Sequence, residues 1–571
     1  MKNSRFLLLS SLSILWAISP VFSYAQVMPP VPAPATADRI QPIRPLNVPA
    51  TRQQGALITS EAEKGLNIPA DAKNIRVLLK SINVEGVTVF SEQQIRDVYK
   101  QYIGKRITLD TIWIIAERIT RLYRDNGYFL SRAYVPAQEV DTGVFTLRVV
   151  EGYVGRIEKQ NNDGRVGYND RIANDLQNEI LRQKPLNARK LEEFILRMND
   201  LPGRQYRTIL KPLANAPEGA VELVLVSEKQ KASGTVTADN FSSRFLGPYT
   251  GAVSYRDSFI PGQETGIVLG ASMPADELKY VALDHVIPLT AKGALELSGT
   301  HVSAEPGYTL EPFQVESMST NLRLGYRYKM LRQWNQNLTL GAGFTHNNVD
   351  GDIMNTTLTH DRIRAAELKL NYDNVDRWNG YNAVGVQVRR GLEVLGSSKE
   401  NDLNLSRGQA KPDFTTLGID VARQQALGAG FVGMARAAGQ LASDPLYSAE
   451  EFGFGGQSFG RAYDPSEIIG DQGLSGAVEL AYAQIKPLSI GNTRLATTPF
   501  IFYDIGKVWN KDLGAKPESG SSAGIGVRLN HSSGLSGQVG LAQPLSRAID
   551  TPLNGGNGKN PRLLLQISYG F

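Results

Sequence analysis

The sequence predicts a membrane β-barrel of about 16 antiparallel strands, preceded by two small α+β units. Three observations predict this: one short apolar leader, a β-α-α-β-β order that occurs twice, and period-2 alternation over the C-terminal three-fifths of the chain. The formal charge of +5 on 571 residues gives no reason to expect nucleic-acid binding. Because the chain has no cysteine and only five scattered histidines, we expect no disulfide, no thiol chemistry, no metal site and no cofactor.

Residues 1–25 are predicted to be a signal peptide. Two basic residues precede an apolar stretch from Phe6 to Ile18, and Ser23 and Ala25 place small side chains where a signal peptidase cleaves. A membrane anchor is the alternative, but about 13 apolar residues are fewer than the roughly 20 that span a bilayer. Seven prolines between Gln26 and Ala50 predict an extended linker, which we assign to residues 26–74.

Residues 75–152 and 153–230 are predicted to be two copies of one α+β unit, the first and second repeat. A similar order after about 75 residues indicates a repeat, and two unrelated α+β domains are the alternative. In the first repeat we expect strands over 77–84, 129–135 and 144–150, a helix over 91–102 with a Ser91–Gln94 capping box, and a helix that ends at Gly127. In the second we expect strands over 154–159, 204–210 and 220–226, and helices over 169–183 and 187–199.

Residues 231–571 are predicted to form the barrel, because apolar side chains occupy every second position. Residues 321–330, 364–373 and 384–389 each place charged or polar side chains on one face and Leu, Val, Tyr or Met on the other. Charges on the inner face would disrupt the dry core of a sandwich, whereas a wet lumen accepts them. The polar face is therefore expected inside, and 571 − 230 = 341 residues, at roughly 20 per strand and turn, give about 16 strands.

The last strand alternates apolar side chains and ends on an aromatic one. Ile567, Tyr569 and Phe571 share its apolar face, and the chain stops at Phe571. Many outer-membrane barrels end in this way, and such a terminal segment is commonly part of the signal that the barrel-assembly machinery recognises. We therefore predict that role for these three residues, with a chance ending as the alternative.

Two such repeats in front of a barrel resemble the outer-membrane transporters of two-partner secretion, the haemolysin-secretion and filamentous-haemagglutinin exporter family. The resemblance covers residues 75–571, and the segments 127–136 and 201–203 carry it in the repeats. The segment 455–463 resembles the tip of the long loop that folds into the barrel in this family. Its Arg461 and Tyr463 are kept, although the usual Val-Arg-Gly is replaced here by Gly460, Arg461 and Ala462.

Phe502, Asp504 and Gly506 match the Phe-x-Asp-x-Gly strand motif of the family. By period 2 these three residues share one face, opposite apolar neighbours, which places Asp504 in the lumen. The resemblance implies that Arg461 contacts Asp504, and this bidentate pair would contribute about 1.5 to 3 kcal/mol. The predicted transport site is thus Gly460, Arg461 and Tyr463 on the loop with Phe502, Asp504 and Gly506 on the strand, while a freely solvated Arg461 is the alternative.

The resemblance implies a pore in the outer membrane that secretes a large adhesin- or haemolysin-like exoprotein without ATP. The repeats would be periplasmic POTRA domains that bind this client, and the other partners are outer-membrane lipid and the barrel-assembly machinery. Any plug helix, usual in the family, would be shorter than usual or lie near residues 51–65. One alternative is a barrel-assembly factor. Such factors commonly have more repeats, and the 49 residues 26–74 are too few for a further one. Another alternative is a small-solute porin.

The segment 456–460 matches the serine-hydrolase elbow, but its loop context does not predict an enzyme.

Overall fold

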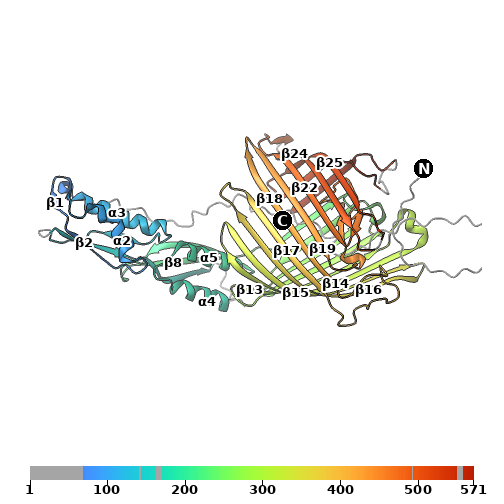
Figure 1. Cartoon of the computed structure of the whole chain (residues 1–571), viewed down its shortest axis with the longest axis horizontal. Helices are drawn as coiled ribbons and strands as arrows, with labels where there is room; N and C mark the ends of the chain where they lie inside the picture. The colour runs from blue at the N-terminus through green and yellow to red at the C-terminus, as the bar shows by residue number, and fades with distance from the viewer. Residues whose placement is uncertain are drawn as a thin grey trace, which may run out of the picture.

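The computed structural model describes residues 68–139, 143–161, 170–485, 487–490, 493–512, 514–549 and 557–571. The predicted signal peptide and nearly all of the predicted linker lie outside these residues. Two small α/β units lie end to end and join a large barrel, with the second unit between the first and the barrel (Figure 1). None of the described helices has both the length and the apolar character needed to cross a bilayer.

The first repeat packs two helices on a three-stranded sheet. Ser91 caps α2 (Glu92–Tyr99) through the predicted capping box with Gln94. The next helix, α3 (Asp110–Asp125), buries its apolar stripe, and Gly127 follows it at φ +87°, the left-handed conformation expected of a C-terminal cap. The sheet order is β2 (Ser81–Glu85), β5 (Val144–Val150) and β4 (Arg132–Tyr134).

The strand expected over 77–84 is in fact two strands. After the short helix η1 (Ala70–Lys73), β1 (Arg76–Leu78) pairs with β3 (Arg106–Thr108), which the sequence did not predict, while β2 joins the main sheet. The two strands separate because the Leu79 amide donates to the Lys105 carbonyl and the Lys80 amide to the Gly143 carbonyl. Side-chain alternation does not report such a change of backbone partner. The helix expected to reach residue 102 also ends early, in η2 (Lys100–Tyr102).

The second repeat has the predicted β-α-α-β-β order. Its elements are β6 (Tyr153–Asn161), α4 (Asp170–Leu181), α5 (Ala188–Asn199), β7 (Arg204–Pro212) and β8 (Ala220–Lys229), and the sheet order is β6-β8-β7. Leu191, Phe194 and Met198 of α5 lie in its core. The repeats are joined by the Asn187 side chain, which donates to the Asn126 carbonyl at 3.0 Å, and by the Ala188 amide, which donates to the Gly127 carbonyl at 2.8 Å.

The barrel closes through 16 antiparallel strands, the number predicted. Seventeen strands follow one another around the described barrel, but β22 also pairs directly with β24, so the three-residue β23 (Leu488–Ile490) adds no strand to the wall. The 16 strands are β9 (Ser233–Asp239), β10 (Thr250–Asp257), β11 (Glu264–Ser272), β12 (Leu278–Pro288), β13 (Gly293–Ala304), β14 (Val315–Arg332), β15 (Gln336–Ile353), β16 (Thr356–Val375), β17 (Tyr381–Gly391), β18 (Thr415–Gly428), β19 (Phe431–Ala442), β22 (Gln472–Tyr482), β24 (Thr493–Trp509), β25 (Glu518–Asn530), β26 (Leu535–Pro544) and β27 (Arg562–Gly570).

The apolar face of the barrel wall points outward and the charged face inward, as predicted. Leu322 and Leu368 are exposed on the outer face, as alternation requires. On the inner face Arg323 of β14 joins Glu296 of β13 and Glu367 of β16 at 3.2 and 2.5 Å. The inward charges therefore neutralise one another across strands.

The second repeat is fixed to the rim of the barrel. Asp200, which follows α5, accepts from the Arg332 guanidinium at 2.9 and 3.0 Å and pairs with Lys329 at 2.7 Å. The buried Arg197 donates to the carbonyl of Ala291, in the β12–β13 turn, at 3.3 Å. Ala291 itself packs against the core of the repeat, so this rim lies on the same side of the membrane as the repeats.

Candidate functional site: the inward loop and its seat

The candidate site is built from residues 443–471, here called the inward loop, which connect β19 to β22. After η5 (Ser448–Glu450), the loop forms a hairpin of β20 (Phe452–Phe454) and β21 (Ile468–Gly470), which pair antiparallel. The segment 455–467 between these strands is the loop tip. It contains the three predicted loop residues, and the hairpin holds it away from the ends of β19 and β22.

Arg461 at the loop tip lies against Asp504 on the inner face of β24. Its guanidinium donates from Nη2 to Oδ1 at 2.7 Å and from Nε to Oδ2 at 3.1 Å, and its backbone amide donates to Oδ2 at 2.9 Å. Arg461 is 10% exposed and Asp504 is fully buried. The guanidinium carbon also lies 3.6 Å from the centre of the Phe502 ring. A planar fork matched to a carboxylate fixes both the position and the orientation of the tip.

Glu479 of β22 is a second partner of Arg461 that the sequence did not identify. Its carboxylate accepts from Arg461 Nη1 at 2.8 Å and from Arg528 of β25 at 2.6 and 3.0 Å. Glu479 pairs in register with Phe502, which brings it beside the motif strand. Period 2 places it on the inner face, but only this register singles it out among the acidic residues of the wall.

Phe454 is a second residue that the sequence missed, and glycines form its binding surface. A Cβ atom at Gly506 or at Gly520 would overlap the Phe454 ring, and so would one at Gly460, whose φ is +81°. The ring of the buried Tyr463 lies 5.8 Å from that of Phe454. The predicted residues Gly460 and Gly506 thus both lie against one aromatic ring, which explains why side chains are absent there.

Tyr463 attaches the loop tip to β25, the strand that pairs with β24 beside Asp504. Its hydroxyl donates to the Ser521 carbonyl of β25 at 2.9 Å and contacts the Arg547 carbonyl at 3.3 Å. Together, the Arg461, Phe454 and Tyr463 contacts hold the tip by hydrogen bonds, one ion-pair network and ring packing. All of these interactions are reversible, so the tip can leave its seat without breaking a covalent bond.

The root of the inward loop has its own anchor, Arg407 in the loop between β17 and β18. Its guanidinium contacts Asp471 at 2.5 Å, Asp512 at 2.5 Å and Glu451 at 3.1 Å. The buried Asp471 also accepts from the Leu446 amide at 2.7 Å. Three loops therefore meet at one cation on the side of the barrel opposite the repeats.

The predicted assembly residues lie at the repeat side of the last strand. Phe571 exchanges backbone hydrogen bonds with Gly234 of β9 at 2.9 and 3.0 Å, and its ring stacks on Tyr569. Ile567 and Tyr569 are exposed on the outer face. These residues therefore lie where the last strand meets the first, far along the chain from the loop tip.

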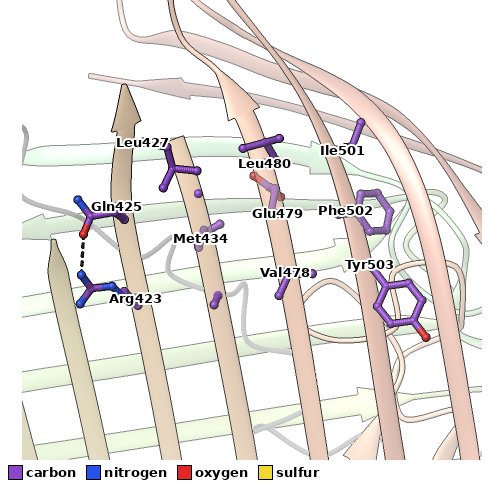
Figure 2. A pocket seen from close by; sticks show the side chains of 12 residues that line it. Arg423, Gln425, Leu427, Met434, Val478, Glu479, Leu480, Ile501, Phe502 and Tyr503 are labelled. Carbon is purple, nitrogen blue, oxygen red and sulfur yellow. Dashed lines mark hydrogen bonds between the residues drawn. The ribbon is translucent and has the colours of Figure 1, made fainter. Parts of the chain in front are cut away.

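A hollow of about 430 Å³ lies on the outer face of the wall behind the site. Figure 2 shows Leu427, Val478 and Ile501 around it, on three of the strands that form this wall, and these side chains are exposed. They alternate with the inward Glu479 and Phe502. The hollow therefore faces the bilayer, and because Glu479 and Phe502 also line it, it shares these two residues with the seat of the loop. No group of three or more potential metal ligands occurs among the described residues.

Comparisons with known proteins agree with this architecture. Residues 77–152 match the POTRA domain, ShlB-type, and residues 290–529 match the haemolysin secretion/activation protein ShlB/FhaC/HecB. The heme/hemopexin transporter protein HuxB of Haemophilus influenzae is 23% identical over 506 residues, which cover 86% of each chain. The outer membrane transporter CdiB of Dickeya dadantii is 21% identical over 500 residues, which cover 82% of this chain and 83% of CdiB.

Solved structures share the fold. CdiB from Escherichia coli superimposes with a TM-score of 0.68 at 17% identity, covering 90% of this chain and 93% of CdiB. BamA from Haemophilus ducreyi lacking POTRA domains 1–3 gives a TM-score of 0.50 at 14% identity, covering 87% of this chain and all of that one. The barrel, the POTRA match and the family match together establish that this chain belongs to the haemolysin secretion/activation family of two-partner secretion outer-membrane transporters.

Proposed function

We propose that this protein secretes a large partner exoprotein from the periplasm to the cell surface, through its barrel and without ATP. The observation that carries the proposal is the inward loop, whose tip is held inside the barrel by Arg461, Asp504 and Glu479. A permanent plug would be as well served by apolar packing. A charged, reversible seat suits a segment that moves aside when a client passes.

The two repeats are proposed to bind the client as POTRA domains in the periplasm. The outer strands of their sheets, β2 and β4 in the first repeat and β6 and β7 in the second, each pair with one strand only among the described residues, which leaves their outer edges open. An extended client can add a strand to such an edge through backbone hydrogen bonds, whatever its sequence. Folding of the client outside the cell would give the transport its direction.

The domain division also remains a proposal. Residues 1–25 would be the signal peptide, 26–74 the linker, 75–152 and 153–230 the POTRA domains and 231–571 the barrel. The proposed partners other than the client are outer-membrane lipid and the barrel-assembly machinery, for which the terminal residues Ile567, Tyr569 and Phe571 would be the signal.

The experiment that tests the function is the Arg461→Ala variant, expressed with its exoprotein. Removing one partner of a buried ion pair costs about 3 to 5 kcal/mol, so the tip should leave its seat and secretion should be lost. The barrel should still insert, because the wall does not depend on Arg461. Inward-facing Arg327→Ala, which removes an ion pair with Glu296 remote from the loop, is the matched control and should secrete normally. Normal secretion by Arg461→Ala would refute the mechanism.

A deletion tests the role of the repeats separately. Removing residues 75–152 should abolish binding of the client to the purified transporter, while the second repeat keeps its contacts with the barrel. Undiminished client binding by this variant would contradict the proposed role of the first repeat.

A further inference from the structure

Arg562, the first residue of β27, joins the inward loop to the segment that follows β9. From Nη1 it donates to the Tyr463 carbonyl at 3.0 Å and to Asp464 Oδ1 at 2.8 Å. From Nη2 it donates to the carbonyls of Asn240 and Ser242 at 3.2 and 2.8 Å. The side chain is only 6% exposed. One buried guanidinium therefore contacts the loop with one nitrogen and the segment that follows the first strand of the barrel with the other.

These contacts lie at the seam, where the last strand closes on the first. Strands β27 and β9 are paired at five positions, from Gln566 to Gly570, whereas β26 and β27 are paired at eight and β9 and β10 at seven. Beyond Asp239 the Asn240 side chain replaces the regular ladder, donating to the Leu563 carbonyl at 2.8 Å and accepting from the Leu565 amide at 2.7 Å. The half of the seam farther from the repeats is therefore held by one backbone bond, from the Asn240 amide to the Leu565 carbonyl at 3.2 Å, and by two side chains, Asn240 and Arg562.

We propose that Arg562 is a positioning residue that couples the seated loop tip to closure of the barrel seam. While the tip is seated, Asp464 neutralises Arg562 and holds its other nitrogen on the carbonyls of Asn240 and Ser242. When the tip leaves, Arg562 loses two of its four acceptors and its charge partner, and this half of the seam loosens. The inference rests on the proposed function, because passage of a client is what moves the tip.

Only arginine can make this connection. Its guanidinium presents five donors in a fixed plane and so reaches acceptors on two sides at once, whereas a lysine ammonium is a single point charge. The coupling must also act in both directions, because two sites linked in free energy affect each other equally. Loosening the seam at Arg562 therefore weakens the seat of the tip.

The test is hydrogen exchange of the full chain in detergent, which needs no client, so its outcome is independent of whether the exoprotein is secreted. Arg461→Ala disturbs the tip without touching the seam, and Asp464→Asn removes the carboxylate from Arg562. Both should raise the exchange rate of the Leu565 and Asn240 amides, which cross the seam, by roughly tenfold or more. Amides in β13 and β14 should not change, and Arg327→Ala is the matched control. Unchanged exchange of the Leu565 and Asn240 amides in Arg461→Ala overturns the coupling, even if Asp464→Asn loosens the seam locally.

The reverse direction uses Arg562→Gln and Arg562→Lys. Both should raise exchange in the loop tip, residues 456–464, and lysine should not rescue it; a tip that stays protected in both variants overturns the proposal. If these variants fail to fold, the loop-side variants still decide the question.

The seam readout is calibrated with a cysteine pair, since the chain has no other cysteine. Thr237 and Ser568 face each other across the seam with hydroxyls 3.0 Å apart. Oxidising Thr237→Cys with Ser568→Cys locks the repeat-side half of the seam, which the proposal leaves closed, so the extra exchange of Arg461→Ala should persist in the oxidised protein. Loss of that extra exchange on oxidation would place the opening in the repeat-side half, and would also overturn the proposal.

Discussion

At the scale of single residues, the seat of the inward loop depends as much on missing side chains as on charges. Gly506 and Gly520 leave the space that the Phe454 ring fills, beside the Arg461–Asp504 pair. The ring and the guanidinium are thus fixed by neighbouring positions of one strand, Gly506 and Asp504. Loss of either contact should release the tip.

We expect Gly506→Ala to displace the loop tip although it leaves every charge in place. The added methyl overlaps the Phe454 ring, and overpacking of this kind costs about 1 to 3 kcal/mol. Gly476→Ala on the neighbouring strand is the matched control, because its nearest contacts would lie at 3.8 Å. Secretion assays of the two variants check this: Gly506→Ala should reduce export and Gly476→Ala should not. Equal export would mean that the ring is not needed to seat the tip.

The sequence predicts the Arg461–Asp504 contact because period 2 and a family motif act on the same strand. Alternation alone places Asp504 inside the barrel. The resemblance of the segment 455–463 to the family's loop tip identifies Arg461 as the partner of Asp504. Glu479 and Phe454 lacked the motif: period 2 places Glu479 only among many inward charges, and the partner of Phe454 is a pair of glycines. Their roles depend on the register between β22, β24 and β25, which local patterns do not contain.

At the scale of elements, α5 fixes the angle between the repeats and the barrel. Burial opposes ionisation of Asp200, but the hydrogen bond from Arg332 and the charges of Lys329 and Arg332 hold its pKa below the ordinary value. A carboxyl whose pKa is lowered on folding stabilises the folded state above its unfolded pKa of about 3.9, and this stabilisation disappears as the pH falls through the lowered pKa. The junction should therefore be insensitive to pH over the neutral and mildly acidic range.

This pH dependence can be measured with Trp334, whose amide donates to Glu192 of α5 at 2.5 Å. Its fluorescence, isolated by comparison with Trp334→Phe, should stay constant from pH 7 to about pH 4 and change only below that. In Asp200→Asn it should already be altered at pH 7. A transition of the wild-type signal near pH 6 would contradict the assignment to Asp200.

The elements were predicted correctly where the side-chain pattern continues over many residues. The prediction failed where the backbone changes its hydrogen-bonding partner within a short segment. The number of barrel strands follows from length and alternation. The two-stranded sheet of β1 and β3 could not be predicted in this way, since each strand has three residues and period 2 needs more.

At the scale of the whole molecule, closure of the barrel brings the C-terminus onto the first strand. The Phe571 ring covers Gly234, where a Cβ atom would overlap it. We expect Phe571→Ala to lower the fraction of folded barrel, because it removes this contact and the proposed assembly signal together. Phe259→Ala is the matched control, since both rings are 56% exposed. The ratio of folded to unfolded bands in unheated gels measures the outcome, and equal ratios would contradict the prediction.

The height of the wall varies around the barrel. β16 has 20 residues, whereas β9 and β10 have seven and eight. At about 3.3 Å per residue and a tilt of about 40°, β9 and β10 rise only about 18 to 20 Å, less than the apolar band of about 25 Å in barrels of this kind. Lipid tails beside the first two strands must therefore shorten or splay, so that the two leaflets form a shallow dimple there. The membrane is thus expected to be thinnest beside the seam, where the first and last strands of the barrel meet.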